Sequence, residues 1–396
     1  MLSISNLLCD HHAGNEALRY GHTKAQHSTD LQTVTPLALA PRPVVVWATT
    51  QACNLHCVHC YASATAGPAK GELTRDEGYA LLDDLKAFNA PAVLFSGGEP
   101  LMRPEILDFI AHAQKLGLSS TLSTNGLLID DLMADKLAAM GLKYAGISLD
   151  GSNDRHDKLR GMKGAFKATL EAIDRCNVRG IKVGLRFTVH ALNEQDLEEM
   201  FDTCLEHGVQ RLCVYHLAYA GRGGKMQAAD LSGSQTRAIV DRIFERTIRC
   251  HEEGLPLEVL TVGNHTDAAY ILMSLEKSDP ARAAVVRARL EGTGGNRSGC
   301  NIAAVDPVGN VHYDQFSWHY TCGNVREQPF SKIWSDATDP RLAILRDRIT
   351  DLPTRCQECR FVSVCMGNLR TRAEAASGDW LGMDPSCYLT EEETRG

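Results

Sequence analysis

The chain has 396 residues and a formal net charge of −8, with 44% hydrophobic and 23% charged residues. This composition is typical of a folded globular protein and excludes a disordered chain. The acidic balance and the lack of a long basic run argue against nucleic-acid binding, and no apolar run approaches the roughly 20 residues of a membrane span. The N-terminal residues lack the basic start and apolar core of a secretory signal, so the sequence predicts a cytoplasmic protein without a membrane partner.

Cysteine is the most informative residue type in the composition, with 14 copies. Seven of them gather at residues 53–60 and 356–387, in a large chain whose thiols should stay reduced in the cytoplasm. Metal binding therefore accounts for these seven better than disulfides do. Five scattered cysteines are predicted to be small core residues: Cys9, Cys176, Cys204, Cys213 and Cys250.

Residues 1–40 contain no long periodic element, which predicts an irregular N-terminal arm. From residue 43 to about residue 219, short apolar runs rich in β-branched residues alternate with helical patterns, as in repeated β-α units around a parallel sheet. Glycines and a capping-box pair, Thr74 and Glu77, mark helix ends between these runs. The predicted strands are Val44 to Ala48, Ala92 to Ser96, Ser120 to Ser123, Tyr144 to Leu149, Val183 to Val189 and Leu212 to Leu217.

Six β-α units are two short of a closed eight-unit barrel, which leaves a partial barrel or an open doubly wound sheet. We predict an α/β chain with a partial (β/α)6 barrel over residues 41–255 and a smaller C-terminal domain over residues 256–396. Either architecture binds ligands at the carboxyl ends of its strands. The cysteines that follow the first strand should lie at that end.

Cys53, Cys57 and Cys60 form the first cysteine group, with three and then two residues between them. Four cysteines would close a four-iron cluster, whereas three leave one iron open to a substrate or cofactor. On these three cysteines alone, a zinc knuckle completed by His56 or His59 is an alternative.

Glycine and polar residues mark the ends of the next predicted strands, where ligands are expected to bind. Turn formation is the simpler explanation for the loop residues, and a structural ion pair is the simpler explanation for the arginine. The residues are Gly97, Gly98 and Glu99 after the second strand, Ser123 and Asn125 at the third, Ser148 and Asp150 at the fourth, and Arg186 within the fifth.

This set of motifs resembles the radical S-adenosylmethionine (radical SAM) superfamily over about residues 43–220. The resemblance implies that Cys53, Cys57 and Cys60 hold a [4Fe-4S] cluster whose open iron takes the amine and carboxylate of S-adenosylmethionine. It further implies that Gly97, Gly98 and Glu99 meet the cofactor's ammonium and that Arg186 neutralises its carboxylate. Contacts to the ribose and carboxylate would come from Ser123, Asn125, Ser148 and Asp150. His59 stands where the family usually has an aromatic residue.

The second cysteine group can saturate a cluster by itself, with a structural zinc as the alternative. It resembles in part the C-terminal SPASM extension of radical enzymes, but Leu369 and Asp314 stand where the full pattern has cysteines. The resemblance implies one auxiliary [4Fe-4S] cluster, with Cys300 and Cys322 either unpaired or replacing one of its ligands. Its predicted ligands are Cys356, Cys359, Cys365 and Cys387.

Other segments are similar to the tetrapyrrole-modifying branch of the superfamily: residues 17–21, 43–47, 216–223, 312–316 and 323–326. The resemblance implies that two acetate side chains are removed from 12,18-didecarboxysirohaem through a 5′-deoxyadenosyl radical, giving Fe-coproporphyrin III in haem biosynthesis. An external low-potential donor would supply the electron. The alternatives are a haem d1 enzyme that removes propionate side chains, a peptide-modifying radical maturase and a non-enzymatic iron-sulfur carrier.

A tetrapyrrole with several carboxylates needs cations at the barrel mouth. Arg222 and Lys225 are candidates, and His312 and Asp314 could face the substrate or a cluster. The alternative for the cations is solvated surface charge. Weaker candidates for carboxylate binding are Arg19, His22, Lys24 and Arg326, and for binding the substrate iron they are His216 and His319.

Overall fold

The computed structural model describes residues 1–9, 41–255, 257–336 and 338–395. Its core is an 11-stranded sheet in the order β1-β8-β7-β6-β5-β4-β3-β2-β9-β10-β11. Strands β2 to β8, together with β9, run parallel, whereas β1, β10 and β11 pair antiparallel at the two ends. The strands are β1 (Leu2–Ser3), β2 (Val44–Ala48), β3 (Val93–Ser96), β4 (Ser120–Thr124), β5 (Tyr144–Ser148), β6 (Lys182–Val189), β7 (Arg211–His216), β8 (Glu258–Val262), β9 (Ile302–Val305), β10 (Asn310–His312) and β11 (Gly323–Asn324).

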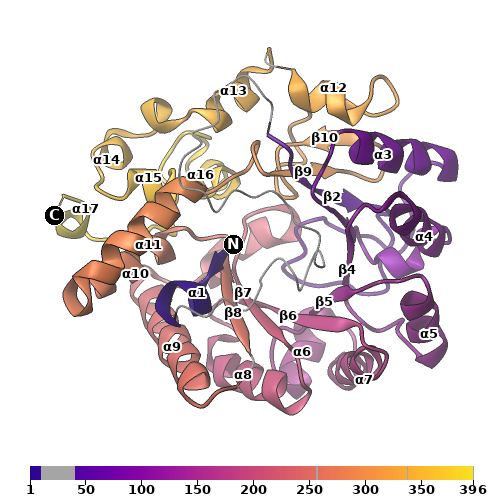
Figure 1. Ribbon diagram of the computed structural model, residues 1–396, viewed down its shortest axis with the longest axis horizontal. Helices are drawn as coiled ribbons and strands as arrows, with labels where there is room; N and C mark the ends of the chain where they lie inside the picture. The colour runs from indigo at the N-terminus through magenta and orange to yellow at the C-terminus, as the bar shows by residue number, and fades with distance from the viewer. Residues whose placement is uncertain (10–40, 256, 337, 396) are drawn as a thin grey trace.

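Helices line the outer side of the curved sheet, as Figure 1 shows for α3, α4, α5, α7, α8 and α9. The helices up to the C-terminal region are α1 (Ile4–Cys9), α3 (Arg75–Ala87), α4 (Ile106–Leu116), α5 (Asp131–Ala139), α6 (Asn153–Arg160), α7 (Ala165–Val178), α8 (Leu197–Glu206) and α9 (Gly233–Glu252). The C-terminal helices are α10 (Thr266–Ser278), α11 (Pro280–Thr293), α12 (Phe330–Ser335), α13 (Pro340–Arg346), α14 (Thr354–Gln357), α15 (Val362–Cys365), α16 (Arg370–Ser377) and α17 (Glu391–Arg395). Short 3-10 segments are η1 (Pro100–Met102), η2 (Glu194–Asp196), η3 (Gly221–Ala229) and η4 (Ile349–Asp351).

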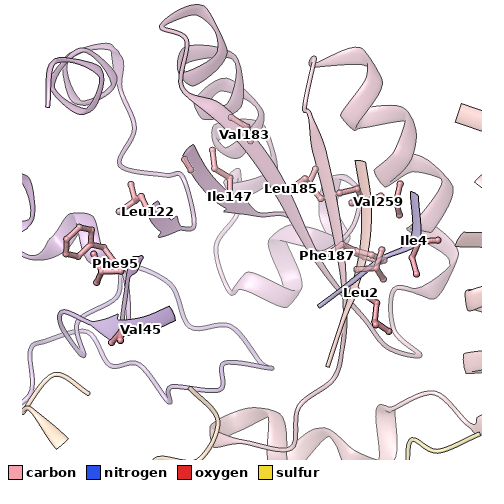
Figure 2. Close-up of a cluster of buried hydrophobic side chains, with 14 of the residues drawn as sticks. Leu2, Ile4, Val45, Phe95, Leu122, Ile147, Val183, Leu185, Phe187 and Val259 are labelled. Carbon is pink, nitrogen blue, oxygen red and sulfur yellow. The ribbon is translucent and has the colours of Figure 1, made fainter. Parts of the chain in front are cut away.

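The main core lies between the sheet and these helices (Figure 2). In β6, Val183, Leu185 and Phe187 are fully buried in it. Side chains alternate along a strand, so Arg186 and Thr188 point to the opposite face, inside the barrel. The strand pattern thus separates an apolar outer face from a lumen that carries polar groups.

The predicted partial barrel is confirmed, and each of the six predicted strands is present with its end within a residue or so of the expected position. The sheet is longer than expected, because β8 continues the parallel run after β7 and β9 joins the other side of β2. Both strands come from beyond residue 255, so the sheet crosses the predicted domain boundary. The division into domains stays a prediction.

The N-terminal residues differ from the predicted irregular arm. Leu2 and Ser3 pair with Thr261 and Leu260 of β8, and Ile4 and Leu7 are buried in the main core. Two residues of strand and one short helix are too brief to leave a periodic signal in the sequence. Residues 10–40, which include Arg19, His22 and Lys24, lie outside the described part of the chain.

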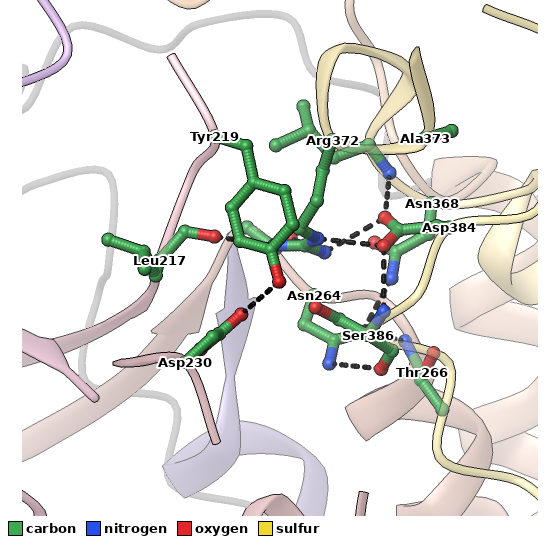
Figure 3. Close-up of polar contacts among 12 residues, drawn as sticks. Leu217, Tyr219, Asp230, Asn264, Thr266, Asn368, Arg372, Ala373, Asp384 and Ser386 are labelled. Carbon is green, nitrogen blue, oxygen red and sulfur yellow. Dashed lines mark hydrogen bonds and ion pairs between the residues drawn. The ribbon is translucent and has the colours of Figure 1, made fainter. Parts of the chain in front are cut away.

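The C-terminal region is fastened to the barrel by a buried arginine, Arg372 (Figure 3). Its guanidinium donates to the carbonyl oxygens of Leu217, at 3.0 Å, and Gly263, at 2.8 Å, just after β7 and β8. It also forms an ion pair with Asp384 at 2.7 Å. One side chain therefore ties α16 and the segment around Asp384 to the carboxyl ends of two barrel strands.

None of the described helices combines the length and the apolar character that crossing a membrane requires.

Candidate active site at the carboxyl ends of the strands

The loop that carries Cys53, Cys57 and Cys60 leaves the carboxyl end of β2, as predicted. Each sulfur has a donor nearby: the Leu55 amide lies 3.4 Å from the Cys53 sulfur, Arg160 Nη1 lies 3.4 Å from that of Cys57, and the Ala64 amide lies 3.5 Å from that of Cys60. Burial raises the pKa of Cys53 to about 11, so its thiol needs a bound cation to become a thiolate. Three free thiols on one loop, with donors to their sulfurs, fit an iron-sulfur cluster.

The zinc-knuckle alternative needs His56 or His59 as its fourth ligand. His59 points instead to a carboxylate, with its Nε2 atom 2.9 Å from Asp150.

Segments distant in sequence hold the cysteine loop from several sides. The side-chain amide of Asn125 donates through Nδ2 to Asn54 Oδ1 at 2.7 Å, which links the end of β4 to the residue after Cys53. Arg222 donates through Nε to the Cys57 carbonyl at 2.8 Å and through Nη1 to the Ala64 carbonyl at 2.8 Å. The backbone of the loop is therefore fixed from β4 and from η3.

Gly221 allows η3 to lie directly on the cysteine loop. Its φ is +55°, and a Cβ atom there would come within 2.3 Å of the Tyr61 carbonyl oxygen. The Gly-Arg-Gly segment after β7 thus braces the loop, and Arg222 uses its side chain for that purpose. This contact differs from the predicted pairing with substrate carboxylates, because the guanidinium faces carbonyl groups of the chain itself.

Gly97 and Gly98 permit a similarly close approach after β3. The Gly98 amide donates to the Thr50 carbonyl at 2.7 Å, and a Cβ atom on Gly98 would lie 2.2 Å from the Ala52 carbonyl oxygen. The loop after β3 is therefore packed against the start of the cysteine loop. The predicted contact of Gly97 and Gly98 with a cofactor ammonium stays a prediction.

Glu99 is completely buried and accepts hydrogen bonds from neighbouring loops. The Thr124 hydroxyl and the backbone amide of Asn125 each donate to its carboxylate at 2.8 Å, and the backbone amide of Leu101 donates at 3.1 Å. Burial raises the pKa of Glu99 to about 7, although these hydrogen bonds act in the opposite direction. Its predicted contact with a cofactor ammonium stays a prediction, since the carboxylate has no exposed surface in this structure.

Arg186 and Ser123 meet inside the barrel, where the guanidinium donates to the hydroxyl. Gly146 on the strand between them makes this possible, because a Cβ atom there would lie 2.4 Å from the guanidinium. Ser148 is paired with Arg186 in the sheet register and shares the same face of β5 as Gly146. The structure thus brings three of the predicted cofactor residues together in the lumen.

Asp150 is fully buried and already paired. Its Oδ2 atom forms an ion pair with Arg160 and lies 2.9 Å from His59 Nε2, and its Oδ1 atom accepts from the Thr188 amide at 2.8 Å. Burial alone would raise the pKa of Asp150, but Arg160 and His59 hold it well below its ordinary value. The predicted contact of Asp150 with the ribose or carboxylate of the cofactor stays a prediction.

Arg160, which the sequence analysis missed, connects this carboxylate to the cysteine loop. Its Nη1 atom lies 3.4 Å from the Cys57 sulfur, although the two residues are 103 positions apart. Its local sequence, at the end of a polar helix, gives no sign of this contact. Tyr61 was also passed over as a site residue: its ring lies 5.4 Å from Phe316 and 6.5 Å from Trp318, measured between centroids.

The second cysteine group encloses a cavity between α10, α15 and the C-terminal segment. All four predicted cysteines line this cavity, together with apolar residues such as Ala269 and Leu389. Cys300 and Cys322 are not among its lining residues; the Cys300 sulfur instead lies 3.6 Å from the Leu345 carbonyl. Arg355 Nη1 lies 3.6 Å from the Cys387 sulfur. The lining cysteines are Cys356, Cys359, Cys365 and Cys387.

His312 and Asp314 have partners within the chain. His312 donates through Nδ1 to the Tyr320 carbonyl at 2.6 Å, and its Nε2 atom lies 3.4 Å from Asp306. Asp314 accepts from the Ser298 hydroxyl and the Phe316 amide. Both residues are buried and shape the loop that carries Phe316 and Trp318, which is a different role from direct substrate contact.

The remaining residues that were predicted to bind the substrate are either exposed or paired within the chain. Lys225 is exposed, and Arg326 pairs with Glu77 at 2.6 Å. His216 shares the outer face of β7 with Val214 and pairs with Asp267 at 2.9 Å, so it faces the helices instead of the lumen. His319 is exposed and lies 2.8 Å from Glu374. Both histidines thus have carboxylate partners, and their binding of a substrate iron stays a prediction.

Comparison with known proteins agrees with this geometry. A family model described as the radical SAM superfamily matches residues 47–204. The chain is 48% identical to Fe-coproporphyrin III synthase of Methanosarcina barkeri over 99% of this chain and 98% of that protein. It is 41% identical to pre-heme d1 synthase of Dinoroseobacter shibae over 89% and 88% of the two chains.

Among solved structures, Streptococcus suis SuiB bound to its precursor peptide SuiA superposes with a TM-score of 0.71. The match covers 89% of this chain and 76% of that one at 19% identity, which supports the shared fold alone. A partial barrel with a three-cysteine loop after its first parallel strand defines a class of iron-sulfur radical enzymes. The chain belongs to the radical SAM superfamily.

Proposed function

We propose that this chain removes the two acetate side chains of 12,18-didecarboxysirohaem and yields Fe-coproporphyrin III. The observation that carries the proposal is the 48% identity to Fe-coproporphyrin III synthase, which extends over 99% of this chain. Such a match includes the C-terminal region as well as the barrel. The substrate would be a small iron tetrapyrrole, and an external low-potential donor would provide the electron.

The radical SAM family implies a [4Fe-4S] cluster and S-adenosylmethionine, and the donor set after β2 fits that cluster. When bound, these cofactors supply a radical that takes a hydrogen atom from the substrate. We assign Cys53, Cys57 and Cys60 as the cluster ligands. Asn125 would orient the loop through Asn54, and Arg222 would hold it in place through its two carbonyl contacts.

The lumen groups are assigned to the cofactor by their chemistry. Arg186 is a cation suited to a carboxylate, and its hydrogen bond to Ser123 would hold it in position. Ser148 lies on the same strand face and would offer a hydroxyl to the ribose. Gly97, Gly98 and Glu99 would supply the backbone close to the cofactor amine, with Glu99 acting as an internal brace of that loop.

We assign the C-terminal cavity to one auxiliary [4Fe-4S] cluster. Four cysteines around one cavity would saturate a cluster, in contrast to the three after β2. Arg355 would donate to the Cys387 ligand. Two clusters correspond to about eight irons per chain.

The aromatic group of Tyr61, Phe316 and Trp318 is suited to a flat macrocycle. Tyr61 follows Cys60 directly, and its hydroxyl is 3.2 Å from Ser96 at the end of β3. A tetrapyrrole packed against these rings would lie beside the radical site, in surroundings that exclude water. Among the cationic candidates that the structure describes, Lys225 is exposed after β7 and available to a substrate carboxylate.

An anaerobic assay tests the proposal. The reconstituted protein is given a reductant, S-adenosylmethionine and 12,18-didecarboxysirohaem, and products are followed by mass spectrometry. We expect 5′-deoxyadenosine together with two successive acetate losses. Loss of propionate instead would identify the pre-heme d1 reaction, and cofactor cleavage without a tetrapyrrole change would overturn the substrate assignment. Absence of 5′-deoxyadenosine would indicate an electron carrier.

A further inference from the structure

We propose that Arg160 is a positioning residue that raises the reduction potential of the cluster on the three-cysteine loop, and that Asp150 limits this effect. The inference rests on the assignment of Cys53, Cys57 and Cys60 as ligands in the proposed function. Arg160 ends α6, and only 8% of it is exposed. Its Nη1 atom is 3.4 Å from the Cys57 sulfur.

The Arg160 guanidinium contacts an anionic group through each of its two terminal nitrogens. Through Nη1 it reaches the Cys57 sulfur, and through Nη2 it contacts the Asp150 carboxylate. A guanidinium keeps its proton in proteins, so Arg160 is a fixed positive charge beside both groups. A lysine could pair with one of these anions at a time, whereas the planar fork serves both.

The position of Arg160 is fixed by its backbone as well. The Arg160 carbonyl accepts from the His56 amide at 3.2 Å, and the Leu159 carbonyl accepts from the Val58 amide at 3.0 Å. The end of α6 is therefore hydrogen-bonded to both sides of Cys57. Movement of the loop would carry the guanidinium with it.

Asp150 is equally constrained. Its carboxylate accepts from the Thr188 amide of β6 at 2.8 Å and lies 2.9 Å from His59 Nε2. The Asp150 amide donates to His156 Nδ1 at 3.0 Å, and His156 is buried on α6. Two strands, the cysteine loop and the helix thus fix the distance between the carboxylate and the sulfur.

Reduction adds one electron to the cluster, and its thiolate ligands share the added negative charge. Hydrogen bonds and positive charges beside the ligand sulfur stabilise the reduced form and raise the potential. In a buried site this interaction is weakly screened. Asp150 pairs with the other terminal nitrogen of the guanidinium, and its negative charge acts in the opposite direction, so it reduces the rise in potential.

The test measures the potential of the radical cluster by redox titration followed by electron paramagnetic resonance. The signal that changes on addition of S-adenosylmethionine identifies this cluster. The variants are Arg160→Gln, Asp150→Asn and the double variant. We expect potentials in the order Arg160→Gln, double variant, wild type and Asp150→Asn, from lowest to highest. A purely structural ion pair would not shift the two single variants in opposite directions.

Arg155→Gln is the matched control, because Arg155 lies on the same helix and pairs with the buried Asp196 at 2.7 Å. It has no contact with a cysteine among the described residues, and we expect the wild-type potential. If a single variant fails to load iron, Arg160→Lys is measured as well, and its reduction potential should fall between those of Arg160→Gln and wild type. Equal potentials in all loaded variants, or shifts in the same direction, would overturn the inference.

Failure of the underlying assignment has a separate signature. Replacement of Cys53, Cys57 and Cys60 by alanine should remove about four irons per chain. An unchanged iron content would refute the ligand assignment itself. An intact assignment with unmoved potentials would refute only the role of Arg160.

Discussion

The two cysteine groups each place a guanidinium beside one sulfur, but they differ in where the counter-ion lies. At the three-cysteine loop, Arg160 pairs with Asp150, whose side chain is 0% exposed. In the C-terminal cavity, Arg355 pairs with Glu391, whose side chain is 60% exposed. Water and salt screen the second pair and scarcely reach the first. The comparison shows how one contact can have different electrostatic strength at two sites of a chain.

The largest expected difference between the two sites is in activity. Alanine at Cys53, Cys57 and Cys60 should reduce 5′-deoxyadenosine formation to background, because the open iron is lost. Alanine at Cys356, Cys359 and Cys387 should remove a similar amount of iron yet retain cofactor cleavage. Anaerobic iron analysis and chromatography of the nucleoside measure both. Equal loss of cleavage in the two variants would remove the functional distinction between the sites.

The buried counter-ion should dominate stability. Asp150→Ala leaves the Arg160 charge without its carboxylate, and we expect a loss of about 3–5 kcal/mol in the free energy of unfolding. Urea unfolding under anaerobic conditions, followed by circular dichroism, provides the measurement. A loss below about 1 kcal/mol would mean that the Arg160–Asp150 pair contributes no more to stability than an ordinary surface ion pair.

Glu99 should make the stability of the barrel depend on pH. Its pKa is raised to about 7 from the ordinary 4.5, so the folded state binds the proton more tightly. The contribution of Glu99 to the free energy of unfolding is fully present below pH 4.5. It is lost as the pH rises through about 7, and this loss is at most about 3 kcal/mol. Glu99→Gln should be less stable overall, since it loses an acceptor, but should show a flatter profile between these values. An unchanged slope would contradict the raised pKa.

The exposed counter-ion should have the smallest effect. Glu391→Gln is expected to change the free energy of unfolding by less than about 1 kcal/mol, since solvent screens the pair with Arg355. The same urea titration at low and high salt checks this value. A change as large as that of Asp150→Ala would erase the contrast between the two sites.

The parts of the fold predicted from the sequence are those encoded locally. Thr74 caps α3 in a capping box with Glu77, and Gly117 ends α4 in the left-handed conformation. The positions of the first cysteine group and of Ser123 followed from the regular return of strand ends to one edge. Local sequence was enough to predict these features, because β-α units that follow one another in the chain also lie side by side in the sheet.

Other features depend on contacts between distant segments. Nothing near Arg160 indicates that it reaches Cys57, and the Asp-Gly pair at Asp150 reads equally well as a turn or as a ligand site. The short strands β9 and β1 acquire their place only by pairing with β2 and β8. Their few residues carry too little pattern to be recognised alone.

The sheet order has a consequence for dividing this protein into pieces. A chain ended at residue 255 would lose β8 and β9, the neighbours of β7 and β2 on either side of the barrel. Two rows of backbone amide and carbonyl groups would then be open to pairing with other chains, a recognised route to aggregation. The C-terminal region thus also protects the barrel edges, and a soluble fragment would have to retain residues 258–262 and 302–305.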